Sequence, residues 1–297
     1  MTPGLRGHLA MLCFSALVAG SFSLGSIVAN EIAPTALNAV RFWIAALVLG
    51  GAVLATGTMT RAALFAPWRY VVLGGLFAFY FVLMFEGLKT APPVSAAAVF
   101  TLTPVIAGGF GWLLLRQVTT PRMALALAIG AIGALWVIFR ADLNAFLAFE
   151  VGRGEVIYFF GCISHAIYTP MVRKLNRGEP AVVFTFVVLV AGAVLLTVFG
   201  WSDLMATPWS ALPGIVWITL GYIALFASAA TFLLLQFATM RLPSAKVMAY
   251  TYLTPSWVIG WEMALGNAVP SALVWVGVGL TIVALGLLLR DDDATAV

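Results

Sequence analysis

The tripeptide Leu102-Thr103-Pro104 recurs 151 residues further along the chain as Leu253-Thr254-Pro255, and the same offset carries Pro92 onto Pro243. An offset of 149 residues relates three further sets: Gly111-Trp112 and Gly260-Trp261, Pro121 and Pro270, Gly130 and Gly279. Matches that keep nearly one spacing predict a duplication of about 145 residues. The first repeat is expected over residues 1–145 and the second over residues 146–297.

The composition shows what kind of chain has been duplicated. Of its 297 residues, 63% are apolar and only 9% are charged, whereas a soluble domain is roughly 45–50% apolar and about 25% charged. These values exclude both a water-soluble globule and a disordered chain. The apolar residues form long unbroken runs, which do not fit the alternating strands of a transmembrane barrel.

Ten apolar runs, each about as long as a helix that crosses a bilayer, are separated by polar or proline-containing breaks. They cover residues 8–29, 35–56, 69–88, 92–115, 121–139, 154–174, 180–199, 213–239, 244–265 and 271–289. The sequence therefore predicts an all-α membrane protein with ten transmembrane helices, five in each repeat. Because five is odd, the second repeat is expected to be inverted in the membrane relative to the first.

The basic residues predict the orientation of the chain. With the N-terminus in the cytoplasm, eleven of the fifteen Lys and Arg residues fall on inner connectors, and Arg41 lies inside a run. Only Lys89, Arg140 and Arg153 fall on outer connectors. This distribution obeys the positive-inside rule and predicts that both termini are cytoplasmic. The net charge of +4 therefore indicates orientation, and no nucleic-acid partner is expected.

Several functional classes lack the residues that they need. The two cysteines, Cys13 and Cys162, lie inside apolar runs without a second ligand at metal spacing, so neither a metal site nor a disulfide is predicted. No nucleotide-binding loop, dinucleotide fingerprint or hydrolase motif is present. We expect no cofactor and no enzymatic activity. The partners expected are a small-molecule substrate and the lipid bilayer, and the oligomeric state is left open, a monomer included.

Pro34 at the start of the second run, the pair Arg41-Phe42, and the two Leu-Thr-Pro motifs together form a known pattern. They resemble the EamA type of the drug/metabolite transporter superfamily across nearly the whole chain. Within that superfamily the sequence is most similar to the bacterial exporters first described for aromatic amino acids. The resemblance implies a multi-pass secondary transporter of the bacterial inner (cytoplasmic) membrane that exports amino acids.

The sequence departs from this pattern before the fifth and tenth runs. The family often carries Gly-Glu there, whereas this chain has Arg116-Gln117 and Gly266-Asn267. Any role that those glutamates have in relatives is therefore not carried over.

Three prolines inside predicted helices mark candidate kinks. Pro104, Pro170 and Pro255 each leave the carbonyl four residues earlier without its usual donor. Such carbonyls are tolerated at membrane depth only when they are buried in protein or face a wet cavity. The kinks either improve packing or help to build a transport site, and the symmetric placement of Pro104 and Pro255 favours the second interpretation.

His165 lies near the middle of its run, at a depth where ionisable side chains are costly and face the bundle interior. It is expected either to bind substrate or a proton, or to be a neutral histidine bonded to a neighbouring helix. Hydroxyl groups at similar depth complete the predicted substrate site. They belong to Tyr80, Thr101, Thr103, Tyr250 and Thr254.

Arg41, Glu86 and Glu262 lie in the outer thirds of their runs and could form an extracellular gate. The alternative for Glu86 is a simple pair with Lys89, three residues later on the same helix. Small residues, in contrast, predict close helix packing. They are Ala126, Gly130 and Ala134 in the fifth run, with Gly279 and Gly286 in the tenth.

The sequence thus predicts a secondary transporter that exports amino acids by alternating access. Facilitated diffusion and proton antiport are equally compatible with a single deep histidine. One alternative is a broader drug or metabolite exporter. Another is a membrane-embedded enzyme acting on lipid-linked substrates, which would need a cluster of acids, histidines or metal ligands near the membrane face.

Overall fold

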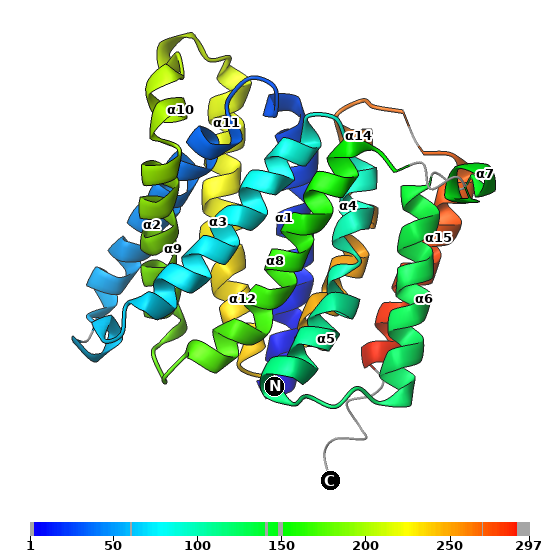
Figure 1. Ribbon diagram of the computed structural model, residues 1–297, viewed down its shortest axis with the longest axis horizontal. Coiled ribbons are helices and arrows are strands. Elements are labelled where there is room, and N and C mark those ends of the chain that lie inside the picture. Colours follow the sequence, from blue (N-terminus) through cyan, green and yellow to red (C-terminus); the bar gives the residue numbers. More distant parts are fainter. Residues whose placement is uncertain (1–2, 60, 140–141, 148–150, 269, 290–297) are drawn as a thin grey trace.

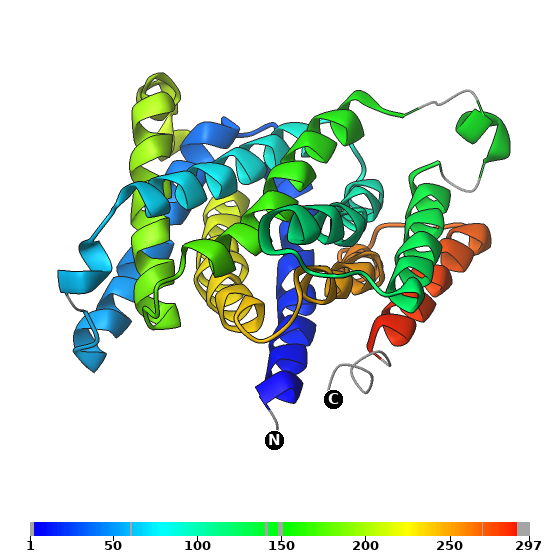
Figure 2. The same ribbon diagram turned by 60° about the horizontal axis from the view of Figure 1, so that its bottom comes forward.

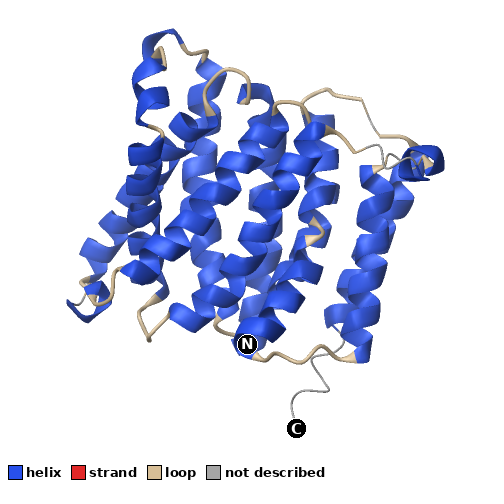
Figure 3. Ribbon diagram, viewed as in Figure 1, coloured by secondary structure: helices blue, strands red, loops and turns tan. Residues whose placement is uncertain are grey.

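The computed structural model describes residues 3–59, 61–139, 142–147, 151–268 and 270–289. Across these ranges every regular element is a helix (Figure 3). In chain order the elements are α1 (Pro3–Val28), α2 (Pro34–Thr56), η1 (Arg61–Leu64), α3 (Trp68–Leu88), α4 (Pro93–Phe100), α5 (Thr103–Leu115), α6 (Pro121–Ile138), α7 (Leu143–Leu147), α8 (Arg153–Leu175), α9 (Ala181–Phe199), α10 (Trp201–Ala206), η2 (Trp209–Ala211), α11 (Gly214–Ala224), η3 (Leu225–Ala230), α12 (Thr231–Thr239), α13 (Ser244–Ala249), η4 (Tyr250–Leu253), α14 (Thr254–Ala264) and α15 (Ala272–Leu289). The label η marks short 3₁₀-helices, except that η3 is a π-helix.

Eight helical segments of the described chain are long and apolar enough to cross a membrane. The other two predicted spans correspond to α8 and to the run α13–η4–α14, which contain more polar side chains. Most of those side chains are buried inside the bundle, as His165 in α8 and Lys246 in α13 show. A count based on apolar length therefore omits these two segments. Ten membrane crossings remain a prediction.

The helices pack in pairs across the bundle. α2 packs on α9, α6 on α15, α3 on α8, and α1 on α11, η3 and α12. The two interrupted helices lie against each other antiparallel, because α4 packs on α14 while α5 packs on α13. Figures 1 and 2 show α1 and α8 in the middle of the molecule, with the α2–α9 and α6–α15 pairs at opposite edges.

The α6–α15 pair is held at close range by two glycines. A Cβ atom added to Gly277 would lie 2.7 Å from the carbonyl oxygen of Gly133, and a Cβ on Gly133 would lie 2.7 Å from the carbonyl oxygen of Gly277. The prediction that Gly279 and Gly286 pack closely against another helix is therefore wrong, because both face open space. The contact face of α15 is instead the one that carries Gly277.

On α6 the predicted small residues do face the interior. Ala126 and Ala134 are fully buried, and a side chain on Gly130 would collide with the Tyr252 ring of η4. Small residues on this face allow α6 to pack on α15 and to approach Tyr252 of the second interrupted helix, whose hydroxyl donates to the Leu127 carbonyl of α6 at 3.5 Å.

Gly277→Ala is expected to lower the free energy of unfolding by about 1–3 kcal/mol, because the added methyl forces the α6 and α15 backbones apart. Gly279→Ala is the matched control on the same helix, and it is expected to leave stability unchanged or to raise it by up to about 1 kcal/mol. Thermal unfolding of both variants in one detergent measures the difference. Equal shifts for the two variants would contradict the packing described here.

Candidate functional site

The interior of the bundle holds a cluster of rings around one histidine, which we call the central aromatic cluster. His165 of α8 is 1% exposed, and its ring centroid lies 4.6 Å from that of Tyr80 and 5.3 Å from that of Phe100. The members come from α3, α4 and α8. They are Phe77, Tyr80, Phe100, Tyr158, His165 and Tyr168.

The polar atoms of the central aromatic cluster are unequally satisfied. The hydroxyls of Tyr80 and Tyr158 are 3.0 Å apart and bond to each other. The carbonyl of His165 accepts a hydrogen bond from the Thr169 hydroxyl at 3.2 Å. The Nδ1 atom of His165, however, is buried without a hydrogen-bond partner among the residues that the structure describes. A buried polar atom in this condition is costly unless another group binds it, so it marks a candidate ligand contact.

The first interrupted helix breaks where its proline predicts. α4 ends at Phe100, and Pro104 is the second residue of α5. The Phe100 carbonyl, which Pro104 deprives of its backbone donor, accepts the Thr103 hydroxyl at 2.7 Å. Thr101 likewise donates to the carbonyl of Ala98 at 2.6 Å. Both predicted hydroxyls are therefore bonded to the backbone at the break.

The second interrupted helix breaks at the equivalent position. Its α13 is followed by the 3₁₀ turn η4, and Pro255 is the second residue of α14. The Thr251 hydroxyl lies 3.3 Å from the Thr103 hydroxyl of the other break. Thr254, which matches Thr103 in the repeat, has a buried hydroxyl without a hydrogen-bond partner within the described ranges. The two breaks therefore meet inside the protein.

Pro170 behaves differently from the other two prolines. It lies inside α8, which continues without interruption from Arg153 to Leu175. The carbonyl that loses its backbone donor to Pro170 is that of Ala166, whereas the Thr169 hydroxyl bonds the preceding carbonyl, that of His165. α8 thus remains one continuous helix, and His165 lies within it.

Tyr250 begins the break of the second interrupted helix, but its side chain does not join the central aromatic cluster. Its hydroxyl lies 3.1 Å from Nδ1 of His8, near the start of α1. The central aromatic cluster instead contacts α1 at Phe22, fourteen residues or about 21 Å further along that helix. The Tyr250 side chain therefore extends toward the face at which α1 begins. With His8 and neighbouring leucines it lines a small pocket of about 290 Å³.

The predicted outer gate is also corrected, because its three residues find separate partners. Glu86 pairs with Lys89 at 2.6 Å, which is the simple alternative. Glu262 accepts a hydrogen bond from Asn267 at 2.8 Å. Arg41 contacts neither carboxylate.

Arg41 instead links α2 to the π-helix η3. It is fully buried, and it donates to the Ala227 carbonyl at 2.7 Å and to the Ser228 hydroxyl at 2.6 Å. Its guanidinium lies 3.6 Å from the centre of the Phe81 ring. A π-helix exposes backbone acceptors and is frequent at functional positions, but this one has no sequence signal that predicts it.

Some members of the central aromatic cluster could have been found from spacing. Tyr158 and Tyr168 lie seven residues before and three residues after His165, which places all three on one side of a helix. Phe77 and Phe100 have no such signal, because their position depends on how α3 and α4 pack on α8.

Metal chemistry finds no support in the parts of the chain that the structure describes. No group of three or more His, Cys, Asp or Glu side chains there could hold a metal ion.

A separate polar network ties α3 to the connector between α8 and α9. Arg69 at the start of α3 is 1% exposed and donates to the Glu179 carboxylate at 2.8 Å and to the Leu175 carbonyl at 2.6 Å. Burial acts to raise the pKa of Glu179. Hydrogen bonds from Arg69 and from the Arg177 backbone, with the charge of Arg69, outweigh burial and hold that pKa below its ordinary value.

This network predicts acid sensitivity. Because the folded-state pKa of Glu179 is depressed, its stabilising contribution is present above the unfolded-state pKa of about 4.3 and is lost as the pH falls through the lower folded value. Between about pH 5 and pH 3 the unfolding temperature of the native protein should therefore fall more steeply than that of Glu179→Gln. Parallel slopes in thermal unfolding at graded pH would refute this prediction.

An apolar helical bundle in which two proline-broken helices meet beside buried polar side chains is the architecture of a membrane transport protein. Comparison with known families agrees with this class. The model of the EamA-like transporter family matches residues 5–139 and again residues 152–290. The chain belongs to the EamA-like transporter family.

Similar proteins point to the same class. The chain is 25% identical over 287 residues to the uncharacterized transporter YyaM of Bacillus subtilis (strain 168), a match covering 96% of this chain and 93% of that protein. It is 23% identical over 213 residues to the uncharacterized transporter sll0355 of Synechocystis sp., covering 68% of this chain and 61% of that protein. A solved crystal structure has the same fold, with a TM-score of 0.74 over 99% of each chain at 21% identity.

Proposed function

We propose that this member of the family is a secondary transporter that exports amino acids, aromatic ones among them, across the bacterial inner membrane. Its ten helices form two inverted repeats, residues 1–145 and 146–297, which rock about a central site and open it to one side at a time. The observation that carries this proposal is the meeting of the two interrupted helices at the hydroxyls of Thr103 and Thr251.

The helix pairing supports the inverted repeats. α2 and α6 of the first repeat pack on their counterparts α9 and α15. The antiparallel contact between the interrupted helices also pairs equivalent elements. Two repeats related by a pseudo-twofold axis in the membrane plane are expected to pair in this way. The family model also matches once on each side of the proposed boundary.

The basic side chains support a cytoplasmic location for the face at which α1 begins and α15 ends (Figure 1). The described basic residues at the helix ends and connectors of that face are Arg6, Arg61, Arg69, Arg116, Arg122, Arg173, Lys174, Arg177, Arg241 and Lys246. Lys89 and Arg153 lie at the opposite face. The predicted outer Arg140, the predicted inner Arg290 and both chain ends lie outside the described residues.

The central aromatic cluster supports an amphiphilic substrate. Its rings offer flat apolar contacts, and Nδ1 of His165 offers one buried polar contact. The unpartnered Thr254 hydroxyl at the second break offers another. An amino acid has both an apolar side chain and a polar head, so it can use both kinds of contact.

The test is uptake of labelled phenylalanine and threonine by proteoliposomes of the purified protein, with and without an imposed pH gradient. Flux of both without a gradient supports an amino-acid facilitator. Flux that requires the gradient supports amino-acid transport with proton coupling. If neither amino acid moves while aromatic cations do, the broader drug or metabolite exporter replaces the amino-acid assignment. No flux of any solute would overturn transport as the function.

A further inference from the structure

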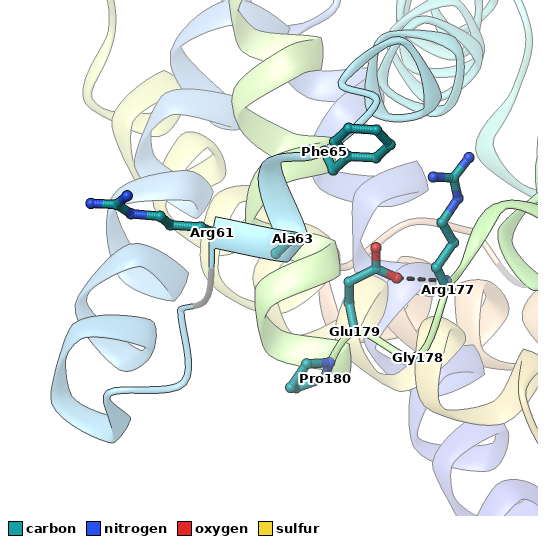
Figure 4. A pocket seen from close by; sticks show the side chains of 7 residues that line it. All are labelled: Arg61, Ala63, Phe65, Arg177, Gly178, Glu179 and Pro180. Atoms are coloured by element: carbon teal, nitrogen blue, oxygen red, sulfur yellow. Dashed lines mark hydrogen bonds between the residues drawn. The ribbon is translucent and has the colours of Figure 1, made fainter.

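A pocket of about 680 Å³ opens at the face where α2 ends and α3 begins. It lies between η1 and the connector that joins α8 to α9 (Figure 4). The lining residues are Arg61, Ala63, Phe65, Arg177, Gly178, Glu179 and Pro180. None of these lining residues belongs to the interrupted helices, and the proposed transport mechanism does not use the pocket.

The charge of this pocket is positive. Arg61 and Arg177 are exposed, and neither guanidinium has a hydrogen-bond or ion-pair partner among the residues that the structure describes. The Glu179 carboxylate is already hydrogen-bonded within the protein, because Arg69 donates to one oxygen at 2.8 Å and the Arg177 backbone N–H donates to the other at 2.6 Å. Figure 4 shows the two arginines on opposite sides of Glu179.

The pocket also has an apolar part. Phe65 lines it with 72% of its side chain exposed, and the neighbouring Leu64 is 54% exposed. Large apolar side chains exposed beside free guanidinium groups match an anion that carries a hydrocarbon portion. A small soluble anion would gain nothing from contact with Phe65 and Leu64.

The position of the pocket indicates where such an anion comes from. η1 follows the end of α2 and the α8–α9 connector leads into α9, and both α2 and α9 are long and apolar enough to cross a membrane. The pocket is therefore expected at the depth of lipid headgroups. Basic pockets between membrane helices at the cytoplasmic side are suited to phospholipid headgroups.

We propose that this pocket binds the phosphate headgroup of an anionic phospholipid of the surrounding bilayer. Arg61 and Arg177 contact the phosphate, and Phe65 and Leu64 contact the glycerol and the first part of the acyl chains. A bound lipid connects η1 of the first repeat to the α8–α9 connector of the second, and it therefore stabilises their relative position. The proposal rests on the membrane-spanning fold and on the cytoplasmic placement of this face in the proposed function, and it does not depend on the transported substrate.

The test is native mass spectrometry of the full-length protein from mixed micelles containing phosphatidylglycerol or phosphatidylcholine. The native protein should retain phosphatidylglycerol, and the double variant Arg61→Gln/Arg177→Gln should bind it at least about tenfold more weakly. Arg122→Gln removes an exposed basic residue on the same face but outside the pocket, and its affinity should stay within about twofold of the native value. Equal unfolding temperatures in a lipid-free detergent show that the variants fold.

Three results would overturn the proposal. Equal retention of the two lipids would show that no anionic headgroup is selected, and undiminished binding by the double variant would place the lipid elsewhere. Displacement of the lipid by soluble glycerol phosphate at a similar concentration would show a site for a free phosphate instead. None of these results depends on solute flux, so the outcome is separate from that of the transport assay.

Discussion

Replacing His165 by alanine is expected to lower the initial rate of phenylalanine flux in proteoliposomes at least about tenfold. The change removes the buried Nδ1 atom, which has no hydrogen-bond partner in the described part of the chain. It also removes the ring that packs 4.6 Å from Tyr80 and 5.3 Å from Phe100. A buried hydrogen bond to a charged group contributes about 1.5–3 kcal/mol, and about 1.4 kcal/mol corresponds to a factor of ten.

Two variants separate this effect from a general loss of packing. His165→Asn keeps a polar side chain at the position and should restore part of the flux. Val172→Ala removes part of a buried apolar side chain seven residues later on α8, and it should leave the flux within about twofold. If Val172→Ala lowers the flux as much as His165→Ala does, packing of α8 rather than contact with substrate limits transport.

Arg69→Ala is expected to cause the largest loss of stability, about 3 kcal/mol or more. The variant leaves the Glu179 carboxylate, which is 7% exposed, without its cation. The carbonyls of Leu175 and Phe65, which accept from Arg69 at 2.6 and 3.0 Å, also lose their donor. Each buried group left without a partner adds about 1–3 kcal/mol to the loss.

The measurement is thermal unfolding in detergent, with Arg122→Ala as an exposed basic control on the same face. Arg122→Ala should change stability by no more than about 0.5 kcal/mol. Arg69→Lys should fall between the native protein and Arg69→Ala, because lysine keeps the charge but loses the planar array of donors. A small effect of Arg69→Ala would mean that water replaces these bonds at little cost.

The sequence was a good guide to the helices. Nine of the ten predicted runs begin and end within one residue of a helix or helix run, and the first helix starts earlier, at Pro3. An unbroken apolar run has one stable solution in a bilayer, since its backbone groups must bond to each other. The interruptions before Pro104 and Pro255 follow from proline chemistry and are equally local.

The candidate site was predicted less well, because depth along a helix does not fix which neighbour a side chain meets. Arg41 turns to η3 rather than to Glu86 or Glu262, and the π-helix that accepts it has no local sequence signature. Tyr250 is separated from His165 because it bonds His8 near the start of α1. These pairings arise from the packing of helices that are distant in sequence, which one-dimensional spacing does not contain.

The two Leu-Thr-Pro motifs have the same sequence but different hydrogen bonds. The Thr103 hydroxyl donates to the Phe100 carbonyl, whereas the hydroxyl of its counterpart Thr254 has no partner among the described residues. One net hydrogen bond is worth about 0.5–1.5 kcal/mol, which corresponds to a population ratio of roughly twofold to tenfold. For two arrangements that differ by one such bond, a solute needs only a comparably small difference in affinity to invert their populations.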